Sequence, residues 1–193
     1  LLIEAGFINE EDVWRRMRLA FEAGNPGVAR VVSNALPESR RPAAALYDRA
    51  TRTPARLLAE GLDAGRRGDR ELALYAIEQL PHSDSAAAAN ALAAWSARLT
   101  PEERQVAWAR LATWSARRHE PAALAWFAQA GRLALNDTQR EWWVRAALRA
   151  GDWPTVLQGI DGMGDATRSL PVWRYWRARA LLAGGQRGVA TPL

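Results

Sequence analysis

Apolar residues recur at helical spacing along most of the chain, and the alternation typical of β-strands is nearly absent. Ala, Leu, Arg and Glu, which favour helices, dominate the sequence, and runs of Val, Ile, Thr and Tyr in alternation do not occur. The pattern predicts an all-α protein. The expected helices span residues 10–23, 26–36, 42–51, 54–66, 69–80, 84–98, 101–117, 120–130, 138–150, 153–161 and 171–183.

A similar break separates several of these helices. Gly24-Asn25, Gly68-Asp69 and Gly151-Asp152 each close one helix and open the next, Gly185-Gln186 is a weaker copy, and His119-Glu120 fills the same position in a further unit. Glycine suits the left-handed conformation that ends a helix, and Asn or Asp suits the N-cap of the following one. We therefore expect left-handed C-caps at these glycines.

The breaks recur at spacings of 44, 51, 32 and 34 residues. Twelve residues after each of the first three glycines comes an apolar residue, namely Leu36, Leu80 or Met163. Irregular periods of this size indicate helical hairpins stacked as a right-handed α-solenoid, in the size class of tetratricopeptide repeats. We expect residues 1–193 to form one such superhelical domain.

Composition is that of a folded protein, with 49% apolar and 24% charged residues. No apolar run approaches the ~20 residues of a membrane span, so none is expected. The chain has no Cys, which excludes disulfides and zinc–thiolate sites. All 26 basic residues are Arg and the net charge is +5. Arginine without lysine indicates either recognition of carboxylate or phosphate, or the codon bias of a GC-rich genome.

Ten tryptophans offer two interpretations. Trp173 and Trp176 form a helical stripe with Ala180, which favours packing against alanine-rich faces. The alternative is a platform on which sugar or nucleobase rings stack. Trp142 and Trp143 are adjacent, so one ring should pack within its hairpin while the other reaches the next hairpin or solvent.

Residue types and spacing indicate no active site. His82 and His119 are too few and too far apart for a metal site, and the turn between Asp161 and Asp165 lacks the ligand spacing of a calcium loop. We expect no metal, no cofactor and no catalytic residue, and no substrate-binding residue can be named. The mixed charges of residues 66–71 are typical of a solvated helix surface, which argues against nucleic acid as a partner.

Two stretches carry a family resemblance. EWWVRAALRAGDW at 141–153 and WRYWRARAL at 173–181 resemble the helical superhelix of soluble lytic murein transglycosylases. Segments 12–24, 53–58 and 117–127 fit the same pattern. The resemblance implies a periplasmic bacterial enzyme that cleaves the MurNAc–GlcNAc bond of peptidoglycan and leaves 1,6-anhydro-muramoyl ends. It also implies a U-shaped superhelix followed by a linker and a lysozyme-like domain, where the Glu of a Glu-Ser motif is acid and base.

The sequence departs from the family at this catalytic motif. Glu38-Ser39, its only Glu-Ser pair, lies in a Pro-bounded turn rather than in the Arg-Gln-Glu-Ser helix of the family, so the catalytic role is not assigned to Glu38. We expect an interior part of a longer protein whose linker and catalytic domain follow. That part would supply ring architecture and hold glycan strands or acidic stem peptides against Arg. The alternative is a helical-repeat scaffold that binds a protein partner.

Overall fold

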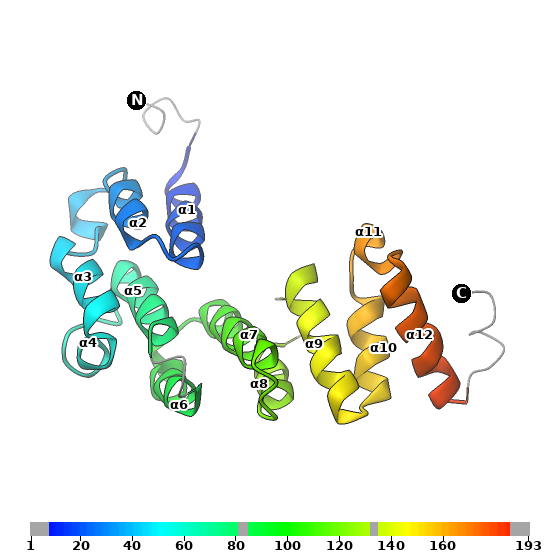
Figure 1. The fold of residues 1–193 in the computed structure, drawn as a ribbon. Helices are drawn as coiled ribbons and strands as arrows, with labels where there is room; N and C mark the ends of the chain where they lie inside the picture. Colours follow the sequence, from blue (N-terminus) through cyan, green and yellow to red (C-terminus); the bar gives the residue numbers. More distant parts are fainter. Residues whose placement is uncertain (1–7, 81–84, 132–134, 186–193) are drawn as a thin grey trace. The chain divides into compact units, whose positions relative to one another are not determined.

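The structure is a computed structural model that describes residues 8–80, 85–131 and 135–185. All regular secondary structure among the described residues is helical, and no strand occurs there. The chain divides into two compact units, Leu1–Thr100 and Pro101–Leu193 (Figure 1).

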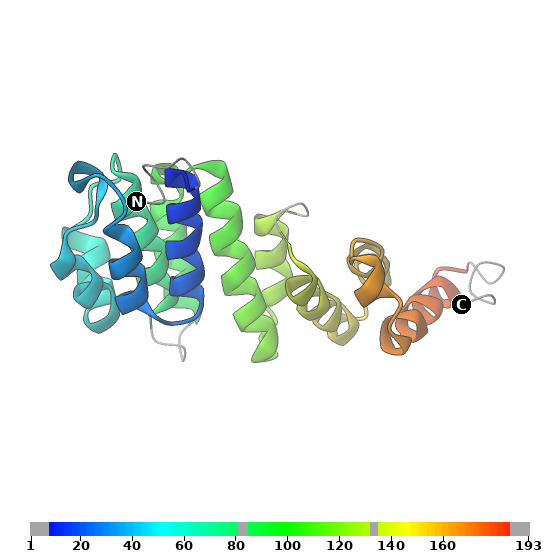
Figure 2. The same ribbon diagram turned by 90° about the horizontal axis from the view of Figure 1, so that it is seen from above.

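The first unit is built from short helices, most of which pack on the next helix in the sequence. Helix α1 packs on α2, and α5 packs on both α3 and α4; Figure 2 shows α1 and α2 side by side along their length. The elements are α1 Glu10–Glu22, α2 Pro26–Ser33, the 3-10 turn η1 Glu38–Arg40, α3 Ala44–Arg52, α4 Pro54–Glu60, α5 Arg67–Glu78, α6 Ser85–Trp95 and the 3-10 turn η2 Ser96–Arg98.

Aromatic rings from three helices form the centre of the first unit. Phe21 of α1 stacks on Tyr75 of α5 with ring centroids 4.7 Å apart, and on Tyr47 of α3 at 6.1 Å. All three side chains are buried, together with Met17 and Leu57. Burial of large aromatic rings dominates the energetics of such small cores, so this stack holds α1, α3 and α5 together.

The second unit consists of consecutive helices that pack on one another as hairpins. Helix α7 packs on α8 and α9, and α10 packs between α9 and α12, as Figure 1 shows for α9, α10 and α12. Its elements are α7 Pro101–Arg117, α8 Ala123–Ala130, α9 Asp137–Ala150, α10 Trp153–Asp161, α11 Asp165–Arg168 and α12 Pro171–Ala183. The expected all-α fold of stacked helical hairpins is confirmed.

Three of the expected breaks share one backbone geometry. Gly24, His119 and Gly151 are left-handed, with φ of 69°, 62° and 70°. Each donates its amide to the carbonyl three residues back, and the next residue donates to the carbonyl five residues before it, at 2.8–3.2 Å. This paired bonding satisfies the last carbonyls of a helix. The prediction that His119 takes the position of the glycines is confirmed.

The prediction of a left-handed C-cap is wrong at Gly68. This residue lies inside the first turn of α5 rather than after a helix, and it is not left-handed. A Cβ atom at Gly68 would lie 2.8 Å from Pro42 Cγ and 3.1 Å from the carbonyl oxygen of Arg40. Glycine is therefore needed here for close packing of α5 against the segment before α3, not for a turn.

Some helix boundaries also differ from the expected ones. Helix α4 ends at Glu60 instead of continuing to residue 66, the last turn expected for α6 is the separate turn η2, and α11 was not expected. The residues expected after the glycines, Leu36, Leu80 and Met163, are all buried. Gly185 is left-handed with φ 77°, while Gln186 and His82 lie outside the described residues. None of the described helices is long and apolar enough to span a membrane.

Candidate functional site

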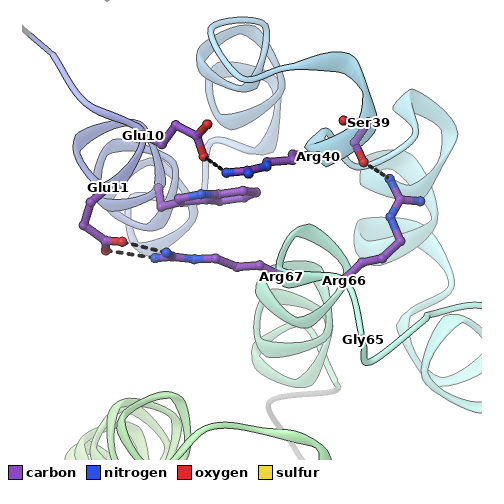
Figure 3. Close-up of a pocket in the computed structure, with 8 residues that line it drawn as sticks. Glu10, Glu11, Ser39, Arg40, Gly65, Arg66 and Arg67 are labelled. Carbon is purple, nitrogen blue, oxygen red and sulfur yellow. Dashed lines mark hydrogen bonds and ion pairs between the residues drawn. The ribbon is translucent and has the colours of Figure 1, made fainter. Parts of the chain in front are cut away.

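A pocket of about 460 Å³ opens on the first unit (Figure 3). It lies where the start of α1, the turn η1 and the start of α5 come together. Its lining is mostly charged and comprises Glu10, Glu11, Trp14, Ser39, Arg40, Gly65, Arg66 and Arg67. These residues come from three separate stretches of sequence, which folding of the unit brings to one place.

The start of α1 positions the two acids. Asn9 caps the helix and forms a capping box with Asp12, so α1 begins at Glu10. Trp14 lies one turn further along the same helix. Residues three and four apart share a helix face, and Glu10, Glu11 and Trp14 therefore line the pocket together.

Both acids are paired with arginines. Arg67 donates two hydrogen bonds to Glu11, at 2.6 and 2.9 Å, and Arg40 pairs with Glu10 (Figure 3). The hydrogen bond from Arg67 lowers the pKa of the Glu11 carboxyl below its ordinary value. Both carboxylates accept hydrogen bonds from guanidinium groups, and the lowered pKa favours the charged form of Glu11.

Arg66 supports the wall of the pocket through backbone contacts. One terminal amine donates to the carbonyl oxygens of Ser39 at 3.3 Å and Arg41 at 2.9 Å. These bonds tie the loop before α5 to the turn η1. The Arg66 side chain itself is exposed, so it lines the pocket at a position reachable from solvent.

The two arginines occupy an unfavourable end of α5. Arg66 is its N-cap and Arg67 its first residue, and cations are disfavoured at the positive N-terminus of a helix. Glu11 offsets this repulsion from the neighbouring helix α1. Departures from such local rules are expected at functional or strained sites, which makes this pocket a candidate site.

Trp14 does not serve as a stacking platform. Its side chain is 3% exposed, and the guanidinium of Arg67 lies 5.0 Å from its ring centroid. A sugar ring cannot reach a face that is already covered. The ring instead lies beneath Arg67, and the lining of the pocket is mainly charged and polar.

The arrangement does not support acid–base cleavage of a glycoside. A general acid for that reaction needs a raised pKa, whereas the pKa of Glu11 is lowered. Glu38 is exposed on η1 and does not line the pocket, although the adjacent Ser39 does. In the described part of the chain no group of three or more His, Asp or Glu side chains is arranged to hold a metal ion. The pocket is suited to binding hydroxyl, amide or carboxylate groups.

The tryptophans behave as packing residues. All ten are buried or half-buried, and Trp173, on the expected stripe, is 1% exposed. Trp142 and Trp143 differ in burial, but both pack in the cluster formed by α7, α8 and α9 instead of separating as expected. Trp143 is buried against Phe127 of α8 with ring centroids 6.2 Å apart, while Trp142 is half-buried next to the guanidinium of Arg117 at 5.6 Å.

Arg145 joins two of these rings. Its guanidinium lies 4.9 Å from the centroid of Trp142 on α9 and 4.9 Å from that of Trp173 on α12. Planar guanidinium groups stack on aromatic faces, which an ammonium does less well. Packing on tryptophan is therefore one structural role of arginine in this lysine-free chain.

The expected solvated surface at residues 66–71 is only partly correct. Asp69 and Glu71 are 4% and 2% exposed. The Asp69 carboxylate accepts a hydrogen bond from the backbone amide of Asp63, and Glu71 forms an ion pair with Arg18 of α1. The sequence did not indicate the burial of Glu71 because its partner Arg18 is 53 residues away, and it did not indicate the pocket because the lining comes from three separate segments. The one available signal was the pair of cations at a helix start.

No protein-family model matches the sequence, and curated proteins give no significant match. Solved structures that are similar to the chain include two lytic transglycosylases. The X-ray structure of an inactive mutant of the lytic transglycosylase Slt from Pseudomonas aeruginosa has 26% identity and a TM-score of 0.67, over 95% of this chain and 30% of that chain. The 70-kDa soluble lytic transglycosylase in complex with bulgecin A has 22% identity and a TM-score of 0.59, over 98% of this chain and 31% of that chain.

These matches confirm the resemblance to soluble lytic transglycosylases that residues 141–153 and 173–181 indicate. The more distant structure supports the fold alone. This chain spans less than a third of the length of either protein.

Proposed function

We propose that residues 1–193 form one non-catalytic superhelical region of a lytic transglycosylase that acts on peptidoglycan in the periplasm. The parent enzyme would cleave the MurNAc–GlcNAc bond and produce 1,6-anhydro-muramoyl ends. The observation that carries the proposal is the match to lytic transglycosylase Slt over 95% of this chain. The charged pocket is the surface through which this region contacts peptidoglycan.

The lack of an acid catalyst in the pocket supports a binding role. The carboxylates of Glu10 and Glu11 are both paired with arginines, and the pKa of Glu11 is lowered, whereas a general acid needs a raised pKa. The side chains of Arg40 and Arg66 are exposed and present donors that suit the hydroxyl and N-acetyl oxygens of glycan strands. The region would thus hold substrate while another part of the enzyme performs the chemistry.

The test is incubation of the chain with purified sacculi. We expect it to sediment with sacculi and to release no anhydro-muropeptides, while the parent enzyme releases them. Arg40→Gln should weaken sedimentation. Arg56→Gln is the matched control, because Arg56 is also an exposed arginine of the first unit paired with a glutamate, but lies outside the pocket.

Three outcomes would contradict the proposal. Release of anhydro-muropeptides by the chain alone, at a rate comparable to the parent enzyme, would show that it is catalytic. Capture of one specific protein partner, with no measurable binding to sacculi, would favour the alternative of a helical-repeat scaffold for protein–protein interaction. Cell fractionation that placed the parent enzyme in the cytoplasm would contradict the periplasmic location.

A further inference from the structure

A second charged pocket, of about 620 Å³, opens on the second unit. It lies where α10 ends, α11 ends and α12 begins. Its lining consists of Asp161, Arg168, Ser169, Arg174 and Arg177. Nothing in the function proposed above uses these residues.

Arg177 presents unused donors in this pocket. Its Nε atom donates to Asp161 at 2.7 Å. Within the described part of the chain its two terminal amines have no hydrogen-bond partner. The side chain is 26% exposed, so the guanidinium is partly removed from water yet reachable. A guanidinium in this state offers a two-pronged edge that matches a carboxylate.

Arg168 adds a second cation whose present partner is weakly held. One of its terminal amines pairs with Asp165 at 2.5 Å, and the other reaches the carbonyl oxygen of Asp161 at 3.4 Å. The Asp165 side chain is 90% exposed. Exposed ion pairs contribute little free energy, so a ligand can replace this one at low cost.

The lining of the pocket is rich in guanidinium groups. Three arginines, Arg168, Arg174 and Arg177, and one carboxylate, Asp161, line it. The Ser169 hydroxyl donates to the backbone of Asp165, and its oxygen can still accept a bond. The pocket thus combines a carboxylate-binding edge with nearby acceptors.

We propose that this pocket binds an acidic peptide, with a peptide carboxylate on the terminal amines of Arg177. Backbone amides of the peptide donate to Ser169 and Asp161. The stem peptides of peptidoglycan are the expected source of this peptide, and in that respect the inference rests on the proposed function. A nucleic acid is a poorer fit, because Asp161 and Asp165 repel the closely spaced phosphates of its backbone.

The test is isothermal titration of the chain with muropeptides that retain the stem peptide. The same disaccharides stripped of peptide by an amidase, a synthetic glutamate-containing peptide and a single-stranded oligonucleotide are the other probes. We expect Arg177→Gln to weaken muropeptide binding at least about tenfold, and Arg177→Lys to do the same, because lysine keeps the charge but not the fork. The control is Arg179→Gln, an exposed arginine of the same helix outside the pocket.

Thermal unfolding of each variant verifies that it folds. Unchanged muropeptide affinity in folded Arg177→Gln, equal affinity for the peptide-free disaccharide, or tighter binding of the oligonucleotide would each overturn the assignment. If sacculi bind while Arg177→Gln has no effect, this inference fails and the proposed function stands. If the glutamate peptide binds through Arg177 and sacculi do not bind, the proposed function fails and the pocket assignment stands.

Discussion

Arg18 of α1 donates two hydrogen bonds to the buried carboxylate of Glu71 on α5, from Nε at 3.1 Å and from a terminal amine at 2.5 Å. The Glu71 side chain is 1% exposed, and Nε of Arg67 lies 3.8 Å away. A buried carboxylate without its partner is strongly unfavourable. This pair therefore fixes α1 against α5 and, with them, two of the three segments that form the first pocket.

Arg18→Met should lower the free energy of unfolding by about 3 kcal/mol, the lower end for a broken buried pair because Arg67 remains close to Glu71. Urea unfolding followed by circular dichroism measures the loss. Arg16→Met is the control, because Arg16 is an exposed arginine of the same helix. Equal losses in the two variants would contradict the role given to the pair.

Asp137, at the start of α9, gives the second unit a dependence on pH. Hydrogen bonds from the Thr167 hydroxyl at 2.6 Å and from the Gly164 amide at 3.0 Å lower the pKa of Asp137 below its ordinary value of 3.8. The folded value lies below the unfolded one. The stabilisation is therefore present above pH 3.8 and is lost as the pH falls through the folded value.

Asp137→Asn should be less stable than the wild type at neutral pH, and the two should converge under strongly acidic conditions. Urea unfolding over a pH series measures this difference. Asp48→Asn is the control, because Asp48 is an exposed aspartate on helix α3. A difference that persists unchanged at acidic pH would show that the carboxylate charge is not responsible.

Trp173 and Trp176 separate packing from recognition. Trp173 is 1% exposed among the buried residues of α9, α10 and α12, so Trp173→Ala should cost about 3–5 kcal/mol of unfolding free energy. Trp176 is only half-buried, and Trp176→Ala should cost clearly less. Thermal unfolding compares the two. An unchanged melting temperature together with weaker sacculus binding would instead identify a stacking platform.

Local patterns account for what the sequence predicted well. Helix starts such as Thr100-Pro101 and breaks such as Gly151-Asp152 act within a few residues, so α7 and α10 begin where expected. Twelve residues after Gly151, Met163 is buried as its place in the hairpin predicts. These features follow from hydrogen bonding and hydrophobic spacing along one chain segment.

Long-range packing accounts for what was missed. The burial of Glu71 depends on Arg18, which is 53 residues away. The close packing at Gly68 depends on Pro42, which lies in another segment. The first pocket brings together the start of α1, the turn η1 and the start of α5, and no single segment carries its signature. Charge pattern alone therefore predicted a solvated surface where the structure has a buried ion pair.

His119 offers a test in which a substitution should stabilise the protein. Its φ of 62° is left-handed, which costs a residue with a side chain ~1–2 kcal/mol, and its backbone bonds match those at Gly151. His119→Gly removes that strain but gains ~0.5–1 kcal/mol of unfolded-state entropy. The net expectation is a rise in unfolding free energy of about 0.5–1 kcal/mol, measured by urea unfolding.

The reciprocal change at the equivalent position is the control. Gly151 has φ 70°, and a Cβ there would meet no atom within 4 Å, so Gly151→Ala introduces backbone strain without a steric clash. It should lower the unfolding free energy by ~1 kcal/mol. A loss of stability in His119→Gly, together with the expected loss in Gly151→Ala, would show that the His119 side chain stabilises the end of α7 by more than its backbone conformation costs.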